Sequence, residues 1–209
     1  MNLQYYGHAC FALRLSDGTA LVFDPFDPSV PYPVCDARCD AALISHSHFD
    51  HNYTKSLTGE FVTIDAPGEY TVGGAKITAI PSFHDDAGGA KRGRNLIFRI
   101  EAEGLSIAHL GDLGHLPDER QLAALEGLDI MLVPVGGFYT IDTYQAEQVM
   151  SMVKPRCTVP MHYKMHADDP NPISTAETFI KDTNAQQMPN EIEITKDAAL
   201  PAVIVMNIE

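Results

Sequence analysis

The amino-acid sequence predicts a layered α/β fold, and three observations support this prediction. The chain has 209 residues, enough for one sizeable hydrophobic core and too few for two comfortable ones. Short apolar segments separated by turn signals fill its first half, as expected of strands. Patterns of helical periodicity lie in its second half. Because no internal repeat, low-complexity tract or linker divides it, residues 1–209 are predicted to form a single domain.

The strands are predicted from runs of apolar and β-branched residues that are bounded by Gly, Pro, Asn, Asp or Ser. Ser16-Asp17-Gly18 is one such turn signal, and a proline-rich loop from Pro25 to Pro33 marks another boundary. In chain order the predicted strands are residues 3–6, 9–15, 19–23, 41–45, 61–65, 75–83, 95–100, 105–110, 130–135, 157–161 and 202–208.

Two helices are predicted from apolar spacing and from the residues at their ends. Residues 118–126 follow Pro117 and stop before Gly127, in keeping with proline at helix starts and glycine after helix ends. Residues 143–153 carry an apolar face at i, i+3, i+4 and i+7, and Pro155 terminates them. That face consists of Ala146, Val149, Met150 and Val153.

A third helix is predicted to run through Lys181. The segment Ser174-Thr175-Ala176-Glu177 has the capping-box pattern, in which a hydroxyl and a carboxylate three residues apart satisfy the first backbone donors of a helix. Ala176, Phe179 and Ile180 would form the inner face of this helix.

The acidic composition limits the partners that the surface can bind. The chain has 28 acidic and 14 basic residues and a formal net charge of -14, so it repels a phosphate backbone and nucleic acid is not an expected partner. Residues 1–8 lack the basic and apolar regions of a signal peptide, and no run is long enough to span a bilayer. We therefore expect a cytoplasmic protein that binds no membrane.

The cysteines are expected to be reduced thiols. Cys10, Cys35, Cys39 and Cys157 are too few and too scattered for a disulfide framework in a chain of this length. The Cys35–Cys39 spacing resembles half of a metal site, but no second pair of cysteines follows it.

The segment His46-Ser47-His48-Phe49-Asp50-His51 places four metal-binding side chains within six residues. It follows an apolar run directly, so it is expected at the end of a strand and in the turn beyond. In extended backbone alternate residues point the same way, so His46 and His48 can hold one metal ion, with Asp50 in the same register. His51 points elsewhere and can serve a second ion. Imidazole and carboxylate ligands favour zinc, with manganese and iron as alternatives.

Further candidate ligands also follow predicted strands. They are His84 after residues 75–83, Asp112 after residues 105–110 through Gly111, and His162 after residues 157–161. Ligands gather at strand ends in layered α/β proteins, so these side chains are expected to converge on one site. A single histidine is more often a surface or hydrogen-bonded core residue. A cluster of four ligands in six residues is costly to bury without a purpose.

The His-x-His-x-Asp-His pattern at residues 46–51, followed in order by His84, Asp112 and His162, resembles the signature of the metallo-β-lactamase-fold hydrolase superfamily. The resemblance covers almost the whole chain. Within the superfamily the chain resembles the compact branch related to ascorbate-6-phosphate lactonase. The segments that carry this finer resemblance are Gly7-His8-Ala9-Cys10, Asp24-Pro25-Phe26, Gly111-Asp112-Leu113-Gly114-His115 and Gly136-Gly137.

The resemblance implies a four-layer αββα sandwich with two metal ions at one edge of its two sheets. The implied ligands are His46, His48 and His84 for the first ion, Asp50, His51 and His162 for the second, and Asp112 as a bridge between them. His48 stands where diiron oxidoreductases of the superfamily carry a glutamate, which argues against a redox function.

Two metal ions that share a water lower its pKa toward neutrality, and the hydroxide so formed attacks an electrophilic carbonyl or phosphorus atom. The ions then stabilise the charge that develops on the substrate oxygen. Asp50 and Asp112 are the candidate catalytic carboxylates, Asp50 because it could hold or shuttle the proton.

Other polar residues are candidates for supporting roles. Asp24 matches the aspartate that braces the metal-binding loop in the superfamily by hydrogen bonds. His8 is either a supporting or substrate-facing residue or a structural histidine. His109 is expected in the core, because it lies on the same strand face as apolar residues. His115 and His166 lie in predicted loops and are lesser candidates for substrate contact.

The basic cluster Lys91-Arg92-Gly93-Arg94 begins seven residues after His84 in an otherwise acidic chain. Its loop could bring Arg94 to the metal edge to receive a phosphate or carboxylate of the substrate, or it could be a solvated turn. Lys164 is a similar candidate for substrate binding, and Tyr139 could line the pocket.

The expected function is hydrolysis of a small anionic substrate, a lactone or another ester, by means of two divalent metal ions. Phosphodiester hydrolysis by the same ions is the alternative within the enzymes. A non-catalytic, metal-stabilised regulatory module is the alternative of another class, and it predicts a closed metal site without an open coordination position.

Overall fold

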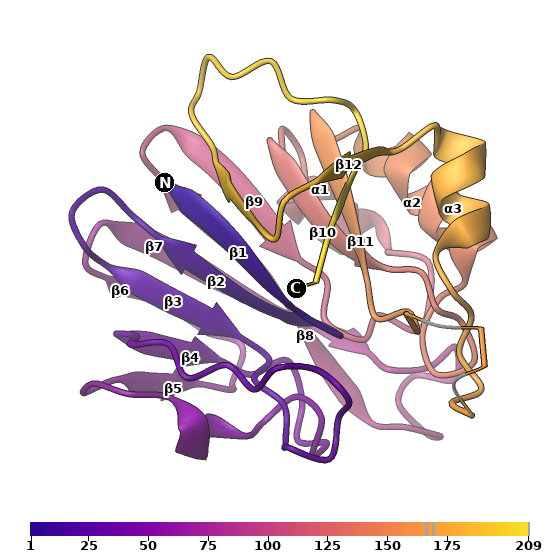
Figure 1. Cartoon of the computed structure of the whole chain (residues 1–209), viewed down its shortest axis with the longest axis horizontal. Helices are drawn as coiled ribbons and strands as arrows, with labels where there is room; N and C mark the ends of the chain where they lie inside the picture. Colours follow the sequence, from indigo (N-terminus) through magenta and orange to yellow (C-terminus); the bar gives the residue numbers. More distant parts are fainter. Residues whose placement is uncertain (166, 169, 209) are drawn as a thin grey trace.

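The computed structural model describes residues 1–165, 167–168 and 170–208, and two six-stranded β-sheets form its centre (Figure 1). The N-terminal sheet contains, in spatial order, β13 (Glu191–Glu193), β1 (Asn2–Gly7), β2 (Cys10–Arg14), β3 (Ala20–Phe23), β4 (Ala41–Leu43) and β5 (Val62–Ile64). The C-terminal sheet contains β11 (Cys157–Met161), β10 (Ile130–Pro134), β9 (Leu105–His109), β8 (Arg94–Ala102), β7 (Ala75–Phe83) and β6 (Gly68–Val72). A short parallel pair, β12 (Gln186–Met188) and β14 (Ile204–Met206), borders β11.

Each sheet combines an antiparallel part with a parallel part. In the N-terminal sheet β1, β2 and β3 are antiparallel neighbours, whereas β3, β4 and β5 are parallel. In the C-terminal sheet β6 to β9 are antiparallel, whereas β9, β10 and β11 are parallel. It follows that β1, β3 and β4 run in the same direction as one another within the N-terminal sheet. Likewise, β7, β9, β10 and β11 share one direction within the C-terminal sheet.

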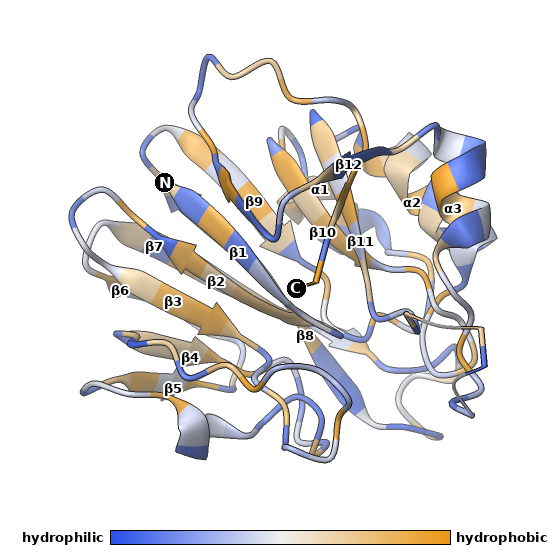
Figure 2. Cartoon of the chain, viewed as in Figure 1, coloured by the Kyte–Doolittle hydropathy of each residue, from blue (hydrophilic) through white to orange (hydrophobic). Residues whose placement is uncertain are grey.

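Three hydrophobic clusters separate four layers. The largest lies between the two sheets and includes Phe23 and Phe98. A second cluster fills the space between the C-terminal sheet and the helices, and a third covers the outer face of the N-terminal sheet. Figure 2 accordingly shows hydrophobic segments along strands of both sheets, for example β3 and β10. Burying each large apolar side chain contributes about 1.5–3 kcal/mol, so these clusters hold the layers together.

The two outer layers differ in construction. Helices α1 (Glu119–Ala124), α2 (Thr143–Val153) and α3 (Glu177–Thr183) supply the apolar cover of the C-terminal sheet. On the other side, Phe26, Cys35 and Cys39 of a long loop pack on the N-terminal sheet together with Leu57, which follows the short 3₁₀ helix η1 (Thr54–Ser56). No α-helix takes part in that cluster among the described residues. In the described part of the chain, no helix has the length and apolar character needed to cross a membrane.

The helices differ from the sequence prediction mainly at their ends. Helix α2 has the predicted bounds, and Ala146, Val149 and Val153 on its predicted inner face are buried. Helix α1 is shorter than residues 118–126, because Asp118 is its N-cap and forms a capping box with Gln121. The predicted capping box of α3 is wrong. The helix starts after Ala176 without a side-chain cap, and its inner face is nevertheless as expected.

Tertiary contacts explain why the capping box at Ser174 does not form. The Ser174 backbone N–H donates to Gly136 O at 2.7 Å, and its carbonyl accepts from Lys164 N–H at 3.1 Å. Ser174 therefore belongs to a backbone connection between loops instead of a helix terminus. Strands β6, β12 and β13 were not predicted, because their residues are largely polar or exposed.

The cysteines are free and buried, as expected. Cys10, Cys35 and Cys39 belong to the cluster on the outer face of the N-terminal sheet, and Cys157 lies between the sheets. They therefore act as small apolar residues of the core.

Candidate metal centre

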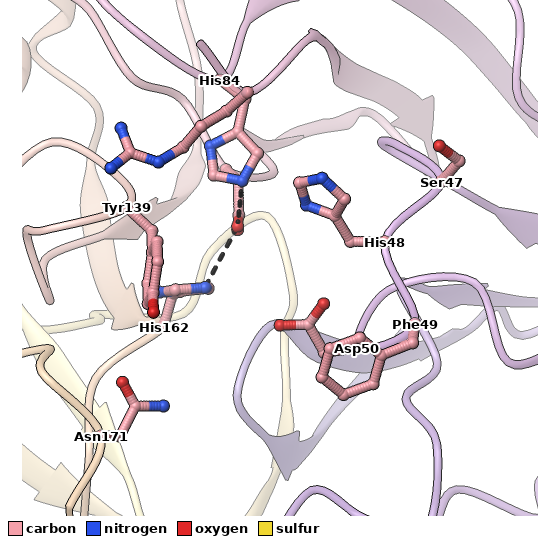
Figure 3. Close-up of a pocket in the computed structure, with 10 residues that line it drawn as sticks. Ser47, His48, Phe49, Asp50, His84, Tyr139, His162 and Asn171 are labelled. Atoms are coloured by element: carbon pink, nitrogen blue, oxygen red, sulfur yellow. Dashed lines mark ion pairs between the residues drawn. The ribbon is translucent and has the colours of Figure 1, made fainter.

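The candidate ligands lie just beyond the carboxyl ends of strands that run in the same direction within each sheet. In the N-terminal sheet His8 follows β1, Asp24 follows β3, and residues 46–51 follow β4. In the C-terminal sheet His84 follows β7, Asp112 follows β9 and His162 follows β11. The shared strand direction thus brings side chains that are distant in sequence to one edge of the sandwich. Figure 3 shows His48, Asp50, His84 and His162 around a common space at this edge.

Asp112 contacts histidines from four different positions in the chain. Its Oδ2 lies 3.1 Å from Nε2 of His84 and of His162, 3.3 Å from Nε2 of His51, and 3.8 Å from Nε2 of His46. The carboxylate is 2 % exposed. Asp112 is therefore the residue on which the candidate ligands converge.

The remaining donors form two groups, which we name the first and second donor groups. The first contains His46, His48 and His84, and the second contains His8, Asp50, His51 and His162. Within each group one ligand atom per residue lies within 4.8 Å of the others. The sets overlap, because Asp24, His46 and His51 also lie within this distance of one another, and the assignment of each ligand to one of two ions stays a prediction.

The backbone around the motif differs from the extended conformation on which the sequence argument relied. Strand β4 ends at Leu43, and residues 45–51 form bends and turns. The prediction of extended backbone is therefore wrong, although His46 and His48 still belong to one group. A turn in which His51 N–H donates to His48 O at 3.0 Å shapes the segment. This turn, in place of strand alternation, separates the histidines between the two groups.

Asp24 holds the segment of residues 45–51 in place through hydrogen bonds. Its Oδ1 accepts from the Ser45 N–H at 2.7 Å, and its Oδ2 accepts from Ser45 Oγ at 2.6 Å and lies 2.9 Å from His51 Nδ1. Both oxygens are therefore engaged, and Asp24 is completely buried. Such a carboxylate orients the ring of His51 and leaves its Nε2 available for another contact.

His8 supports Asp50 in a similar way. His8 Nε2 lies 3.2 Å from Asp50 Oδ2, and the His8 carbonyl accepts from His162 N–H at 2.7 Å. His8, Asp24 and His162 all have positive φ, at 55°, 42° and 52°. For residues other than glycine this conformation costs of order 1–3 kcal/mol, and it occurs preferentially at functional sites. The surrounding contacts therefore hold these three backbones in place.

Two features of the site have little signal in the sequence. Asn95 is buried at the start of β8, accepts from the Asp112 N–H at 2.9 Å, and donates to Ser82 Oγ at 2.7 Å. A polar residue in front of an apolar strand was its only signal. A Cβ at Gly114 would collide with the backbone of His84, and one at Gly136 with the carbonyl of His162. These two glycines therefore let their loops approach His84 and His162 closely.

Burial and charge act in opposite directions on the titratable groups. Burial, reinforced by the neighbouring imidazoles, lowers the pKa of His46 to about 3 and that of His8 to about 4. Burial alone would also lower the pKa of His51, but the carboxylates of Asp112 and Asp24 raise it well above its usual value. Burial opposes ionisation of Asp112, yet His162 and His51 hold its pKa well below the usual range. At neutral pH the site thus combines the ionised carboxylate of Asp112 with the neutral imidazoles of His8 and His46.

Unpaired buried atoms test whether these residues fit a metal ion. His46 Nε2, His51 Nε2 and Asp112 Oδ1 are buried and have no hydrogen-bond partner among the described residues. Leaving a polar atom buried and unpaired costs about 1–3 kcal/mol. Imidazole nitrogens and carboxylate oxygens are the ligands that zinc and similar divalent ions take. The residues present therefore fit a metal centre at this position.

A cavity of about 560 Å³ opens above the donor groups. Its volume falls within the range of about 300–1,000 Å³ that is usual for small-molecule sites. The lining residues are Ser47, His48, Phe49, Asp50, His84, Arg92, Asp112, Tyr139, His162 and Asn171. The sequence had not indicated Ser47, Phe49, Asn171 or Arg92 individually.

The structure separates the predicted substrate-binding residues. Tyr139 lines the main cavity, whereas Lys164 lines a neighbouring cavity of about 170 Å³ together with His8 and Asp50. Arg94 does not line either cavity: it is exposed at the start of β8, opposite Phe83. Its neighbour Arg92 lines the main cavity instead. Within the predicted basic cluster, Arg92 and not Arg94 lines this cavity, and substrate binding by the cluster stays a prediction.

The other histidines have structural contacts. His109 is buried, contacts Ala9 O at 2.8 Å through Nε2, and accepts from the Gly111 N–H at 3.1 Å, as predicted for a core residue. His115 accepts from the Phe83 N–H at 3.2 Å and does not line the main cavity. His166 lies outside the described residues.

The two-sheet sandwich and the His/Asp groups at its strand ends define a protein of the metallo-β-lactamase class. Residues 2–162 match the model of the family described as Beta-lactamase superfamily domain. A UPF0173 metal-dependent hydrolase of Methanoculleus marisnigri is 30% identical over 186 residues, which cover 78% of this chain and 81% of the relative. One of Opitutus terrae is 29% identical over 194 residues, with 78% and 85% covered.

A solved structure from Thermotoga maritima, assigned as a Zn-dependent hydrolase of the metallo-β-lactamase superfamily, has a TM-score of 0.82 and 34% identity. The match covers 98% of this chain and 97% of that chain. The chain therefore belongs to the metallo-β-lactamase superfamily and, within it, to the UPF0173 metal-dependent hydrolase family. The predicted fold and superfamily are confirmed, and the resemblance to ascorbate-6-phosphate lactonase stays a prediction.

Proposed function

We propose that the chain is a hydrolase that uses two divalent metal ions, zinc in the first place, to cleave an ester or lactone bond in a small anionic substrate. The observation that carries this proposal is the position of Asp112. Its Oδ2 lies within 3.8 Å of imidazole nitrogens that belong to both donor groups. A carboxylate between two groups of nitrogen donors is suited to hold two cations close together. Membership of a family of metal-dependent hydrolases supports it further.

The proposed ligands are those implied by the sequence. His46, His48 and His84 would hold one ion, Asp50, His51 and His162 the other, and Asp112 both. When bound, two such ions lower the pKa of a shared water and stabilise negative charge on a substrate oxygen. Zinc is favoured because imidazole predominates among the ligands, with manganese and iron as alternatives.

Residues around the ions position and ionise the ligands. Burial opposes ionisation of Asp50, but the hydrogen bond with His8 keeps its pKa below the usual range, so Asp50 lines the cavity as a carboxylate. We propose that this carboxylate holds the proton lost by the attacking water. Asp24 keeps His51 in one orientation through its contact with Nδ1.

The open cavity favours catalysis over a non-catalytic metal module. A closed structural site would surround its ion with protein ligands, whereas His48, Asp50, His84, Asp112 and His162 all line a cavity of about 560 Å³. That volume suits a small molecule, so a lactone or ester is favoured over a polymeric phosphodiester. Four free, buried thiols support a reducing compartment, and we propose the cytoplasm as the site of action.

The test combines metal analysis with substrate hydrolysis. We expect about two metal ions per chain by mass spectrometry, and hydrolysis of 4-nitrophenyl acetate and of simple lactones that chelation abolishes and added metal restores. The bis(4-nitrophenyl) phosphate diester measures the alternative activity. Absence of metal from freshly purified protein, or activity indifferent to chelation, would sink the proposal.

Asp50→Asn tests the proposed proton-holding carboxylate. With metal content unchanged, turnover should fall by about 100-fold, the usual contribution of a positioned acid–base group. Glu60→Gln removes the same charge from an exposed loop residue and serves as the control. Turnover of Asp50→Asn equal to that of the control would exclude this role.

A further inference from the structure

Arg92 is the residue with a permanent positive charge among those that line the main cavity. Its guanidinium carbon lies 5.5 Å from the centre of the Tyr139 ring, within the range of a cation–π contact. Tyr139 lines the same cavity (Figure 3). The aromatic face therefore supports the guanidinium at the wall of the cavity that contains the candidate ligands.

A single carboxylate organises the loop that carries Arg92. Asp85 Oδ1 accepts from the N–H groups of Ala87 and Gly89 at 2.8 and 2.9 Å, and Oδ2 accepts from those of Lys91 and Arg92 at 2.9 and 2.7 Å. The loop is thus wrapped around the Asp85 side chain, which also satisfies its backbone donors. This arrangement holds the backbone of Arg92 directly.

The same loop is anchored to the metal centre. Asp85 directly follows His84, and the His84 N–H donates to Gly93 O at 3.1 Å. The Gly93 N–H in turn donates to Gly89 O at 3.0 Å. Because both ends of the loop are tied at His84, the position of Arg92 relative to this candidate ligand is determined by hydrogen bonds.

No carboxylate among the described residues forms an ion pair with Arg92. Its neighbour Lys91 forms an ion pair with Asp86 at 2.7 Å. The Arg92 guanidinium has no hydrogen bond or ion pair with another residue in the part of the chain that the structure describes. Its N–H donors are therefore available for a ligand, in a protein whose formal net charge is -14.

We propose that Arg92 binds the anionic group of the substrate, a carboxylate or a phosphate monoester, and that Asp85 is the positioning residue for Arg92. A planar guanidinium offers two parallel donors to such an oxyanion, and the ring of Tyr139 limits its rotation. This inference rests on the proposed function for the reaction, although anion binding can be measured without any reaction.

The kinetic test uses two esters that differ in one charge, 4-acetoxybenzoate and its methyl ester. Arg92→Gln should lower the ratio of kcat/KM for the anionic over the neutral ester by about 10- to 100-fold, mostly through KM, because a charge-assisted pair is lost. Arg94→Gln removes the same charge two residues away and should leave the ratio unchanged. An unchanged ratio in Arg92→Gln, or an equal drop in Arg94→Gln, overturns the proposal.

Asp85→Ala separates positioning from general structural damage. It should raise KM for 4-acetoxybenzoate while leaving kcat and the methyl ester nearly unchanged, and it should add little to Arg92→Gln in the double variant. Asp85→Asn keeps one acceptor oxygen and should give an intermediate KM. Equal losses for both esters, or loss of bound metal in these variants, would show a structural role only.

Equilibrium binding separates this inference from the proposed function. Benzoate and phenylphosphonate are titrated calorimetrically into purified wild type, Arg92→Gln and Arg94→Gln. Weaker binding in Arg92→Gln alone supports the inference even if wild type hydrolyses neither ester, which would count against the proposed function only. The stronger of the two probes in wild type identifies the carboxylate or the phosphate as the preferred group. Equal binding to all three proteins refutes the inference.

Discussion

The two donor groups differ in how the protein holds them. In the first group His84 is buried, but His48 is exposed and stands on a turn. In the second group His8, His51 and His162 are each at most 5 % exposed. In the second group Asp24 contacts His51 and His8 contacts Asp50, and in the first group Ser45 Oγ lies 2.9 Å from His46 Nδ1. The groups therefore differ mainly at one member each: His48 of the first group is exposed and Asp50 of the second is 24 % exposed, whereas the side chains of His46 and His84 are at most 4 % exposed.

This difference has a consequence for the roles of the two halves. A buried, braced group keeps its geometry without a ligand, whereas a group with an exposed member can change its coordination when substrate enters. The main cavity reaches two members of each group, His48 and His84 of the first and Asp50 and His162 of the second. Variants that affect one group at a time can break or sharpen this comparison.

The largest effect on stability is expected from Asp24→Asn. The change removes the buried charge partner of His51 and alters the contacts of Ser45. Breaking a buried pair costs about 3–5 kcal/mol, and loss of a supporting carboxylate lowers metal affinity by about 10- to 100-fold. Chemical denaturation and metal titration of the purified variant measure both quantities.

Glu101→Gln is the matched control for this prediction. Glu101 forms ion pairs with Arg99 and Lys76 and is 44 % exposed, so its loss should change the free energy of unfolding by about 1 kcal/mol or less. If Asp24→Asn were as stable as this control, the second group would not depend on its brace.

A smaller effect on stability is expected from His48→Ala. Because this side chain is exposed, its removal should change the free energy of unfolding by about 0.5 kcal/mol or less. One metal ion per chain should be lost, however, while the second group keeps its own. Metal analysis beside thermal unfolding checks both statements, and a strongly destabilised variant would contradict the contrast between the groups.

A further difference between the groups is expected in proton release on metal binding. The pKa of His51 is raised, so at neutral pH the ring carries a proton that a metal ion at Nε2 must displace. The pKa values of His46 and His48 are lowered, so those rings are already neutral. While the pH is below the His51 pKa, each unit of increase in pH should therefore raise the metal affinity of the second group by about tenfold. The metal affinity of the first group should stay nearly constant over the same pH range.

Calorimetry of zinc binding in buffers of different ionisation enthalpy counts these protons. His48→Ala isolates the second group and His162→Ala isolates the first. Equal proton release from the two variants would contradict the assignment of the raised pKa to His51.

The ligands were predictable from the sequence because each follows a strand, and strand direction alone brings such residues to one edge. The supporting contacts were less accessible. Asn95 has no motif, and its contact with Asp112 depends on the pairing of β7, β8 and β9. The choice between Arg92 and Arg94 depends on the closure of a loop around Asp85, which residue types alone do not specify.

Local patterns failed where longer-range contacts compete with them. The capping-box residues at 174–177 match a helix start, but the Ser174 backbone pairs with Gly136 and Lys164. The motif at 46–51 was expected to be extended because it follows a strand, yet turns place its histidines. The side-chain chemistry was thus predicted more reliably than the backbone that presents it.

The spread of the ligands along the chain also determines when each half of the site can exist during synthesis. Residues 46–112 contain the whole first donor group and Asp112. The second group is complete only after His162 has been synthesised. At about 5–20 residues per second, the 50 residues between Asp112 and His162 take roughly 3–10 s to translate. A growing chain therefore passes through an interval in which an ion could occupy the exposed half-site before β10 and β11 complete the sheet. The order of the strands along the chain therefore completes the first donor group before the second.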